Sequence, residues 1–436
     1  MTPKPGQHHH CTPQPPAPRR LAILGSTGSL GVQTLELCEH FPDRLQVVAL
    51  GASGRHPELL ADQVRRFSPG LVAVTEPGAA ARLRAELGTH PGPLSFPAAA
   101  PHVVAGPQAL IDAALHPDAD LVLVLTVGLT GLAPTLAALE AGRRVALANK
   151  EVLVAAGDLI PAPRLVEEGR LLPVDSEHSA IWQSLLGERR PGIRRLWLTA
   201  SGGPFWGWPP QRLRTVTAEQ ALAHPTWRMG PRVTVDSATL MNKGFEIIEA
   251  HHLFGVPCAD VRVVVHRQSV VHSLVEFCDG SIKAQLSLPD MRLPLLFALS
   301  YPDRWEYRGP PPLFEPGARS RRAGSSGGTG PSGRAEPLTL TFEPLVPGEN
   351  EPRAIRLARQ AAEAGGTYPT VLATADEVAV EAFLAGRLRF DRLLEVVRDA
   401  LDRHTPAPSL SLEAVQEADA WARRTAQEAI DRLESA

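Results

Sequence analysis

Short apolar runs alternate with amphipathic stretches along the N-terminal part of the chain. The apolar runs have the length of buried strands, and the Ala/Leu/Arg-rich stretches between them have helical spacing, first at residues 30–40. Strands that alternate with helices form a parallel sheet that is covered on both faces. We therefore predict a Rossmann-like, doubly wound α/β domain over residues 21–170. Its strands are expected at residues 21–25, 45–50, 71–74, 121–127, 145–148 and 171–174.

The pattern changes over residues 171–305, where strand-like runs surround one long helical stretch. The runs cover residues 195–199, 261–266 and 281–287, and the helical stretch covers residues 238–254. This mixture predicts an α+β region with an antiparallel component.

Composition changes again after this region. Residues 308–336 are dominated by Gly, Pro, Ser and Arg, so we interpret residues 306–350 as a flexible linker. Residues 351–436 are rich in Ala, Leu, Glu and Arg and predict a small helical domain. Residues 1–20 are proline-rich and contain three adjacent histidines. They predict a disordered extension, with metal binding by the histidines as the alternative.

Overall composition limits the class of protein. The chain has 436 residues, 44% hydrophobic and 21% charged, with a formal net charge of −3, which argues against a protein that coats nucleic acid or anionic membrane. Residues 121–139 are uncharged and long enough to span a bilayer, but their glycines, proline and three threonines predict strand, turn and helix instead. The four cysteines form no CxxC pair. We therefore expect a soluble protein of the reducing cytoplasm.

Lysine and asparagine are scarce in this chain. It has four lysines and three asparagines, yet it contains two Asn-Lys dipeptides, Asn149-Lys150 and Asn242-Lys243. Random placement would give about 0.03 such dipeptides (4 × 3/436). We attribute the overall bias to a GC-rich genome, whereas the two pairs indicate a chemical requirement at their positions.

A glycine-rich turn follows the first predicted strand. Its sequence, GSTGSLG over residues 25–31, leads directly into a helix, where backbone amides meet the charge of a pyrophosphate. A plain tight turn is the alternative. The second strand ends in Gly54-Arg55-His56 and carries no acidic residue for ribose hydroxyls. Arg55, helped by His56, suits a 2′-phosphate, which favours NADP(H); the alternative is a solvated surface arginine.

Two acidic residues follow the strand at residues 171–174. In an extended segment Asp175 and Glu177 point to the same side, where a divalent cation would remove their repulsion; a pair of exposed acids is the alternative. The helix near residue 242 places Asn242 and Glu246 on one face, so Glu246 can supply a third oxygen ligand. Oxygen ligands favour Mg²⁺ or Mn²⁺ over zinc.

Donors for a phosphate and a candidate lid lie close by in sequence. Ser237 near the predicted helix start, with Asn242 and Lys243, offers donors for a phosphate, whereas a solvated lysine is the alternative for Lys243. Residues 201–208 and 224–230 hold three of the seven tryptophans in Gly/Pro-rich sequence without helix or strand periodicity. They suit a mobile lid that excludes water, and a static packed loop is the alternative.

Together these motifs resemble the 1-deoxy-D-xylulose 5-phosphate reductoisomerase family. The match covers about residues 21–300 in order, continues more weakly to the end, and is specific because unrelated dehydrogenases share only the first motif. The motifs that carry it are GSTGSLG (25–31), ANKE (148–151), PVDSEH (173–178), SGGPF (201–205), HPTWRMG (224–230), VDSATLMNKGFE (235–246) and PDMRLP (289–294).

The resemblance implies an activity and an assembly. It implies NADPH-dependent conversion of 1-deoxy-D-xylulose 5-phosphate to 2-C-methyl-D-erythritol 4-phosphate with Mg²⁺ or Mn²⁺, by rearrangement to an aldehyde and hydride transfer. It also implies V-shaped homodimers with NADPH-binding, catalytic and C-terminal helical domains. The carbon-skeleton rearrangement rests on the resemblance alone. The alternatives from the residues are an NADP-dependent dehydrogenase of another phosphorylated sugar or semialdehyde, and a catalytically silent NADP sensor.

The resemblance also implies roles for single residues. The metal would be held by Asp175, Glu177 and Glu246, and the substrate phosphate by Ser201, Ser237, Asn242 and Lys243. The substrate would be contacted by Lys150, Ser176 and His224, and the closing loop would carry Trp227 and Met229. NADPH would be held by Thr27, Gly28, Ser29, Leu30, Gly54, Arg55, His56, Asn149, Glu151 and Gly230. The chain departs from the family pattern at His56, beside one extra residue, and in residues 373–377.

Overall fold

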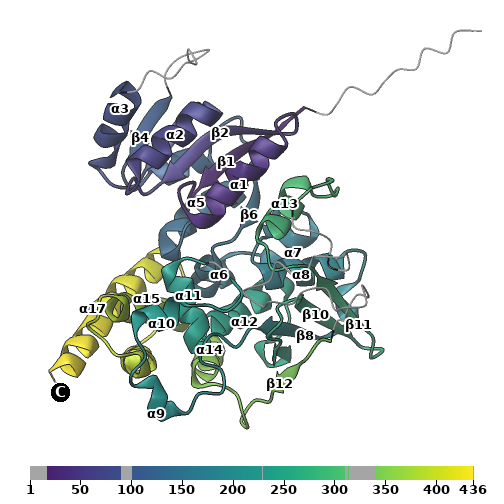
Figure 1. The fold of residues 1–436 in the computed structure, drawn as a ribbon, viewed down its shortest axis with the longest axis vertical. Helices are drawn as coiled ribbons and strands as arrows, with labels where there is room; N and C mark the ends of the chain where they lie inside the picture. Colours follow the sequence, from purple (N-terminus) through teal and green to yellow (C-terminus); the bar gives the residue numbers. More distant parts are fainter. Residues whose placement is uncertain (1–16, 90–100, 228, 310–312, 314–338, 436) are drawn as a thin grey trace, which may run out of the picture.

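A computed structural model describes residues 17–89, 101–227, 229–309, 313 and 339–435 of the chain. The predicted N-terminal extension up to residue 16 and most of the predicted linker lie outside the described residues. Figure 1 shows the N-terminal sheet as an upper lobe above a larger lower part. In this lower part the second sheet, with β8, β10 and β11, lies opposite the C-terminal helices α15 and α17.

The upper lobe is a parallel sheet of seven strands, which confirms the predicted doubly wound fold. The strand order is β4-β3-β2-β1-β5-β6-β7, so the order reverses direction between β1 and β5. Ligands of such sheets bind outside the carboxyl ends of the strands at this point. The strands are β1 (Arg19–Leu24), β2 (Leu45–Ala52), β3 (Leu71–Val74), β4 (His102–Ala105), β5 (Leu121–Val124), β6 (Arg144–Leu147) and β7 (Leu171–Pro173).

Helices cover both faces of this sheet, whose strands are buried Val, Leu, Ile and Ala. The uncharged stretch from residue 121 forms β5, a 3₁₀ turn η1 (Gly128–Gly131) and α5 (Leu132–Glu140), as predicted. Among the described residues, no helix has both the length and the apolar character needed to cross a bilayer. The other helices of the upper lobe are α1 (Ser29–His40), α2 (Pro57–Phe67), α3 (Ala79–Thr89) and α4 (Ala109–Ala114). The chain then enters the lower part with α6 (Lys150–Ala156), η2 (Gly157–Leu159) and α7 (Ala162–Glu167) (Figure 1).

The second sheet has five strands in the order β11-β10-β8-β9-β12. Only β8 and β9 are parallel, while β10 pairs antiparallel with both β8 and β11, so the predicted antiparallel component is confirmed. The pattern of residues 261–287 missed β10, because its buried and half-buried positions do not alternate cleanly with polar ones. The strands are β8 (Ile193–Ala200), β9 (Val261–Val265), β10 (Val271–Phe277), β11 (Ile282–Leu286) and β12 (Glu343–Leu345).

Two local predictions in the central region were wrong. Asp175 and Glu177 do not lie in an extended segment, because α8 (Ser176–Leu185) begins directly after Asp175. The helix predicted from residue 238 is interrupted at Leu240, which takes a left-handed conformation (φ 66°) between α11 (Pro231–Thr239) and α12 (Met241–Phe254). Ser237 therefore lies in the last turn of α11 and not near a helix start.

The C-terminal part is helical, as predicted, and packs on the central region through α12, α6 and α11. Thr370 of α15 donates a hydrogen bond to the carbonyl of Ala155 in α6 (3.1 Å). The helices are α14 (Arg353–Ala364), α15 (Tyr368–Leu384), η5 (Phe390–Arg392), α16 (Leu393–Arg403) and α17 (Leu412–Glu434).

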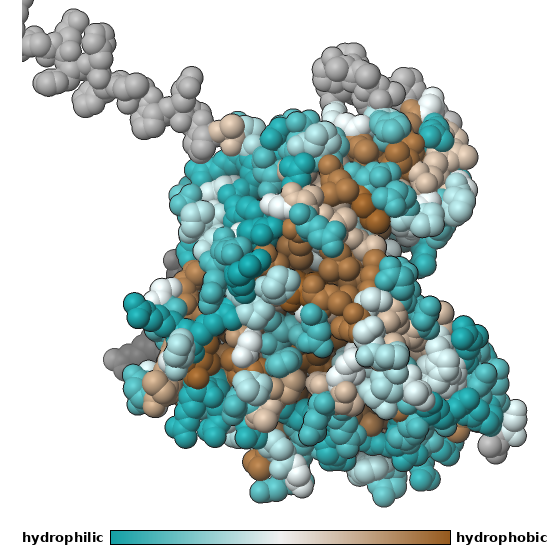
Figure 2. Space-filling model, turned by 180° about the vertical axis from the view of Figure 1, so that it is seen from behind, coloured by the Kyte–Doolittle hydropathy of each residue, from teal (hydrophilic) through white to brown (hydrophobic). Residues whose placement is uncertain are grey.

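The remaining elements of the central region are η3 (Arg190–Gly192), α9 (Pro210–Leu213), α10 (Ala218–Leu222), η4 (Cys258–Asp260) and α13 (Arg292–Ser300). From behind, hydrophobic side chains gather at the waist between the upper lobe and the lower part (Figure 2).

Candidate active site

A polar cavity lies between the second sheet, α8, α11 and α12. It is lined by every metal, substrate and lid residue that the sequence predicted. These residues come from distant parts of the chain, so the fold rather than the sequence brings them together. They are Lys150, Asp175, Ser176, Glu177, Ser201, His224, Trp227, Met229, Ser237, Asn242, Lys243 and Glu246.

Three carboxylates converge at one end of this cavity. Asp175 caps α8, and its side chain accepts a hydrogen bond from the backbone N–H of Ser176 (3.0 Å), while Glu177 lies in the first turn. Glu246 comes from the middle of α12 and is fully buried. One oxygen from each of the three lies within 4.8 Å of the others. This spacing suits ligation of one cation, and carboxylate oxygens favour a hard divalent ion.

The two Asn-Lys pairs meet beside these carboxylates. Lys150, at the start of α6, donates to the side-chain carbonyl of Asn242 at the start of α12 (2.8 Å) and lies 2.5 Å from Asp175. Asn242 donates in turn to Glu246 (2.5 Å). Lys243 contacts both Glu177 (2.9 Å) and Glu246. The predicted pairing of Asn242 and Glu246 on one helix face is therefore present, and Lys150 links it to α6.

The charges at this end of the cavity favour a bound cation. Burial and the neighbouring Glu177 carboxylate raise the pKa of Glu246 to about 8. Burial acts the same way on Glu177, but Lys243, the hydrogen bond from Ser176 and Lys150 together outweigh it and lower the pKa of Glu177 to about 2. A further divalent charge would allow Glu246 to ionise. The residues therefore fit the predicted Mg²⁺ or Mn²⁺.

A buried histidine and carboxyl group lie beneath the three carboxylates. The ring of His178 bonds through Nε2 to the backbone carbonyl of Glu246 (2.9 Å), and its Nδ1 lies 3.4 Å from Glu249. Both side chains are inaccessible to solvent. Burial lowers the pKa of His178 to about 4 and raises the pKa of Glu249. A neutral ring and a neutral acid are thus compatible with this dry site, and they connect α8 to the α12 turn that carries Glu246.

The other end of the cavity presents hydroxyl and imidazole groups. His224 Nε2 lies 3.1 Å from both the Ser201 and the Ser237 hydroxyl oxygens. Its Nδ1 accepts a hydrogen bond from the Trp227 backbone N–H (2.9 Å), so the neutral ring carries its proton on Nε2. Burial lowers the pKa of His224 to about 4, which keeps the ring neutral near pH 7. Three adjacent X–H groups suit an oxyanion such as a phosphate.

Only one of the three loop tryptophans lines this cavity. Trp227 lies between α10 and α11, with its ring centroid 5.9 Å from that of His272. Trp208 packs instead on Phe205 (4.9 Å between centroids), and Trp206 donates to Glu343 (3.3 Å). Residues 201–208 thus form a packed turn, while Trp227 and Met229 supply the side chains of the candidate lid.

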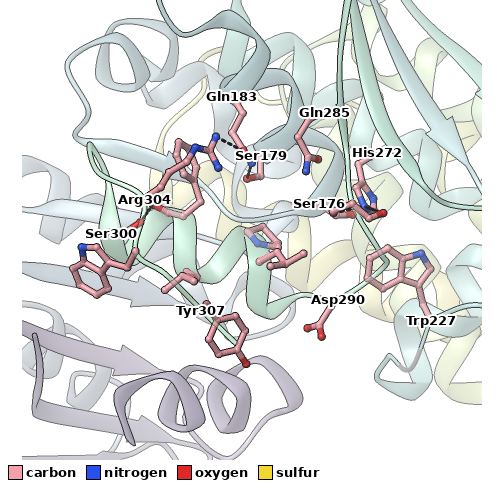
Figure 3. A pocket seen from close by; sticks show the side chains of 16 residues that line it. Ser176, Ser179, Gln183, Trp227, His272, Gln285, Asp290, Ser300, Arg304 and Tyr307 are labelled. Atoms are coloured by element: carbon pink, nitrogen blue, oxygen red, sulfur yellow. Dashed lines mark hydrogen bonds between the residues drawn. The ribbon is translucent and has the colours of Figure 1, made fainter. Parts of the chain in front are cut away.

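A second cavity of about 310 Å³ adjoins the first and shares Ser176, Trp227 and His272 with it. Figure 3 shows Trp227 and His272 on one side of this second cavity, with Gln285 near them and Asp290 below. Arg304 on the far side donates to the side-chain carbonyl of Gln183 (2.7 Å). Trp227 therefore stands between two connected spaces.

The glycine-rich turn has the geometry that a pyrophosphate needs. Gly25 takes φ +97°, and a Cβ on Gly31 would lie 2.3 Å from the Gly25 carbonyl oxygen, so both positions require glycine. Gly28 precedes α1, a helix of 12 residues whose first turn has no acidic residue and no side-chain cap. Its first N–H groups lie at the carboxyl end of β1, beside the strand-order reversal. This is the site that a dinucleotide uses in such sheets.

The remaining predicted cofactor residues lie in two groups. Arg55 is 76% exposed and pairs with Glu76 (3.4 Å), and His56 precedes α2. Asn149 caps α6 and donates to the Gly128 carbonyl (2.9 Å). The exposed Arg55 side chain lies within reach of solvent and of a ligand at the end of β2. Glu151 in α6 pairs with Arg232 (3.3 Å), the second residue of α11, and Gly230 directly precedes this helix.

Comparison with known sequences shows to which protein family the chain belongs. Family models described as 1-deoxy-D-xylulose 5-phosphate reductoisomerase and its C-terminal domains match residues 21–157, 171–254 and 286–425. A reductoisomerase of this description from Symbiobacterium thermophilum is 49% identical over 409 residues, covering 94% of this chain and 98% of the relative. One from Thermomicrobium roseum is 47% identical over 414 residues with the same coverage. The chain belongs to the 1-deoxy-D-xylulose 5-phosphate reductoisomerase family.

Solved structures of the reductoisomerase family have the same fold. The enzyme from Zymomonas mobilis in complex with NADPH is 38% identical, with a TM-score of 0.78, and covers 95% of this chain and 99% of its own. A reductoisomerase in complex with NADPH, fosmidomycin and magnesium is 34% identical, with a TM-score of 0.81 and the same coverage. The expected family membership and three-part architecture are confirmed.

Seven further residues, which were not predicted from the sequence, also line the cavity. His272 and Ser269 come from β10 and the turn before it, which the pattern missed. Met291 lies in the PDMRLP motif, which contributes to the family resemblance, but no role was predicted for this residue. The full set is Thr199, Ala200, Val233, Leu240, Ser269, His272 and Met291.

Proposed function

We infer that the chain converts 1-deoxy-D-xylulose 5-phosphate to 2-C-methyl-D-erythritol 4-phosphate with NADPH and Mg²⁺ or Mn²⁺. The observation that carries this function is one cavity with three carboxylates at one end and a serine–histidine set at the other. A phosphorylated substrate can place its phosphate at one end and its carbonyl and hydroxyl oxygens at the other. Family membership supplies the rearrangement that the geometry alone would not specify.

We assign the metal to Asp175, Glu177 and Glu246. When bound, the divalent cation would withdraw charge from substrate oxygens, and NADPH would supply the hydride. Lys150 is adjacent to this set. Burial opposes its charge, but the carboxylates of Asp175 and Glu246 raise its pKa well above the ordinary value. Lys150 Nζ therefore keeps its proton and donates hydrogen bonds to oxygen atoms at the reacting carbons.

We assign the substrate phosphate to Ser201, Ser237 and the Nε2–H of His224, with Lys243 and Asn242 at its inner edge. In this structure Lys243 is held by Glu177 and Glu246. A cation bound by those carboxylates would replace the ammonium as their counter-charge and leave Lys243 for the phosphate. Ser176 lies between the two ends, at the first residue of α8.

We assign NADPH to the start of α1 and to the end of β2, with Asn149, Glu151 and Gly230 on the substrate side. The amides after Gly28 would meet the pyrophosphate, and Arg55 with His56 would meet the 2′-phosphate. Trp227 and Met229 line the cavity from the loop before α11 and would cover bound substrate, which excludes water during hydride transfer.

One assay tests this function. Purified protein should oxidise NADPH only when 1-deoxy-D-xylulose 5-phosphate and Mg²⁺ or Mn²⁺ are both present, and the product should have the branched carbon skeleton by nuclear magnetic resonance. Undiminished turnover in excess EDTA would remove the metal from the assignment. An unbranched product would indicate a dehydrogenase without rearrangement.

We further propose a homodimer that forms along the edge of the second sheet. β11 is an edge strand whose Ile282 and Leu286 are 55% and 39% exposed, and an exposed apolar edge favours pairing with another copy. Light scattering should give twice the chain mass of 46.8 kDa. Ile282→Lys should shift the protein towards monomer, whereas Leu115→Lys, at an exposed site in the upper lobe, should not. A monomeric wild type would exclude the proposal.

A further inference from the structure

A second group of buried carboxyl groups lies behind the phosphate end of the cavity, where α11 packs on the C-terminal helix α15. Asp236 of α11 and Asp376 of α15 are 2% and 0% exposed. Among the described residues, neither oxygen of Asp376 accepts a hydrogen bond from a donor, and nor does Oδ1 of Asp236. The two carboxyl groups lie close enough for a hydrogen bond between them. Such a bond requires that one of them carries a proton.

The surrounding charges leave these acids without sufficient counter-charge. Arg232 of α11 lies 2.6 Å from Glu377 of α15 and 3.3 Å from Glu151 of α6. Its Nε lies 3.9 Å from the nearer oxygen of Asp236. One buried guanidinium thus faces four carboxyl groups, including Asp376. Four ionised carboxylates around one cation are unfavourable in a dry site, so a retained proton is the stable arrangement.

The other charged groups near this cluster have their own partners. Arg423 of α17 is divided between Glu377 (2.9 Å) and Asp419 (3.1 Å). Asp419 also accepts a hydrogen bond from Thr374 on α15 (2.8 Å). Lys150 of α6 attracts Asp236 electrostatically, but its Nζ is held at the metal end of the cavity. These groups surround the acid pair without supplying either acid with a donor.

We propose that Asp376 is a positioning residue of the substrate site, which holds α11 through a proton shared with Asp236 and thereby fixes Ser237 beside His224. The proposal rests on the assignment of Ser237 to the substrate phosphate. Ser237 directly follows Asp236, and its hydroxyl is 3.1 Å from His224 Nε2. Loss of the shared proton leaves two facing carboxylates, whose repulsion moves α11 away from α15.

The pH dependence has a definite sign. Burial raises the pKa of Asp236 to about 6, and burial together with the Asp236 carboxylate raises the pKa of Asp376 well above its ordinary value. A raised pKa in the folded state means that the folded protein binds the proton more tightly than the unfolded chain does. The pair therefore stabilises the fold at low pH, and this contribution is lost as the pH rises through the raised values.

The matched variant is Asp376→Asn, which keeps a hydrogen-bond donor towards Asp236 and removes the titration. The KM for 1-deoxy-D-xylulose 5-phosphate and the melting temperature are measured from about pH 5.5 to about pH 9. Relative to Asp376→Asn, the KM of the wild type should rise about threefold across this range, with a smaller change in kcat. The ratio removes the titration of the substrate phosphate itself. Glu381→Gln, on the exposed side of α15, should follow the wild type.

A second variant keeps the proposal testable if the first does not fold. Asp236→Asn should flatten both pH profiles in the same way, because either amide replaces the shared proton. Identical pH profiles for the wild type and a folded amide variant would overturn the proposal. Ser237→Ala reports separately on the phosphate assignment: if it leaves the KM unchanged, the assignment fails, while the melting profiles still test the shared proton.

Discussion

At the scale of single residues, charge and burial decide what each side chain of the cavity does. His224 is neutral because it is buried, and Lys150 stays charged because carboxylates surround it. The Lys243 ammonium contacts two carboxyl groups whose pKa values are shifted in opposite directions, that of Glu177 down and that of Glu246 up. These differences follow from burial and from charged neighbours, several of which, such as Lys243 and Glu177, are distant in sequence.

Glu246 offers the sharpest test of the metal assignment. Glu246→Gln removes one charged oxygen ligand while keeping the side-chain shape, so kcat should fall at least about 100-fold and Mn²⁺ affinity should fall as well. NADPH affinity should remain close to that of the wild type, because the glycine-rich turn is untouched. Steady-state kinetics, Mn²⁺ titration and NADPH fluorescence measure the three effects. Equal losses of metal and NADPH binding would indicate a folding defect.

Arg55 tests the choice between the two dinucleotides. Arg55→Ala should raise the KM for NADPH about tenfold and leave the KM for NADH nearly unchanged, because a charged hydrogen bond to the 2′-phosphate is lost. Arg82→Ala is the matched control, since Arg82 lies 3.3 Å from the same Glu76 partner. An unchanged preference for NADPH over NADH would leave Arg55 as a surface arginine. A larger effect of Arg82→Ala would indicate that Arg82, and not Arg55, contacts the 2′-phosphate.

At the scale of elements, the sequence predicted most of what has a regular period. Six of the seven parallel strands and the helix after GSTGSLG followed from apolar runs and glycine positions, whereas the edge strand β4 was missed. The break at Leu240 did not, because leucine rarely adopts a left-handed conformation and only tertiary packing makes it do so. The start of α8 at Ser176 was likewise missed, although Asp175 is a favourable N-cap residue.

The predicted residues of the candidate site lie in short motifs, whereas most of the residues that were missed lie elsewhere. The predicted metal, substrate and lid residues all line one cavity, whereas His272 and Ser269 depended on β10, a strand without clear alternation. The resemblance, and not periodicity, selected Ser201, His224 and Lys150. The burial of Glu249 beneath the three carboxylates could not be predicted, because the sequence of a helix does not distinguish a buried glutamate from an exposed one.

The start of α1 gives a prediction about an element. Gly31→Ala would place a Cβ 2.3 Å from the Gly25 carbonyl oxygen, so the first helical turn must move away from β1. We expect weaker NADPH binding by about tenfold or more and a loss of stability of about 1–3 kcal/mol. Calorimetry and NADPH titration measure both. Gly88→Ala in α3 is the control, because its Cβ would meet nothing within 4 Å. Equal effects of the two changes would contradict this account of the turn.

At the scale of the whole molecule, metal binding and folding stability are linked through pH. The pKa of Glu246 is raised to about 8 without a cation, so its carboxyl group contributes stability at low pH that is lost as the pH rises through about 8. A divalent cation binds the ionised form. The increase in melting temperature caused by Mg²⁺ should therefore be larger at about pH 8 than at about pH 6. Differential scanning fluorimetry measures it, and Glu246→Gln should reduce the difference. A shift independent of pH would contradict the linkage.

The contact between Lys150 and Asn242 also sets a condition for recombining parts of such proteins. Lys150 begins α6, shortly after β6 of the upper lobe, and Asn242 lies in the first turn of α12, so their hydrogen bond links the chain leaving the upper lobe to the helix that carries Glu246. A chimera that exchanges the upper lobe between two relatives cuts the chain between these residues. Such a hybrid keeps this hydrogen bond only if both parents supply matching ends of it.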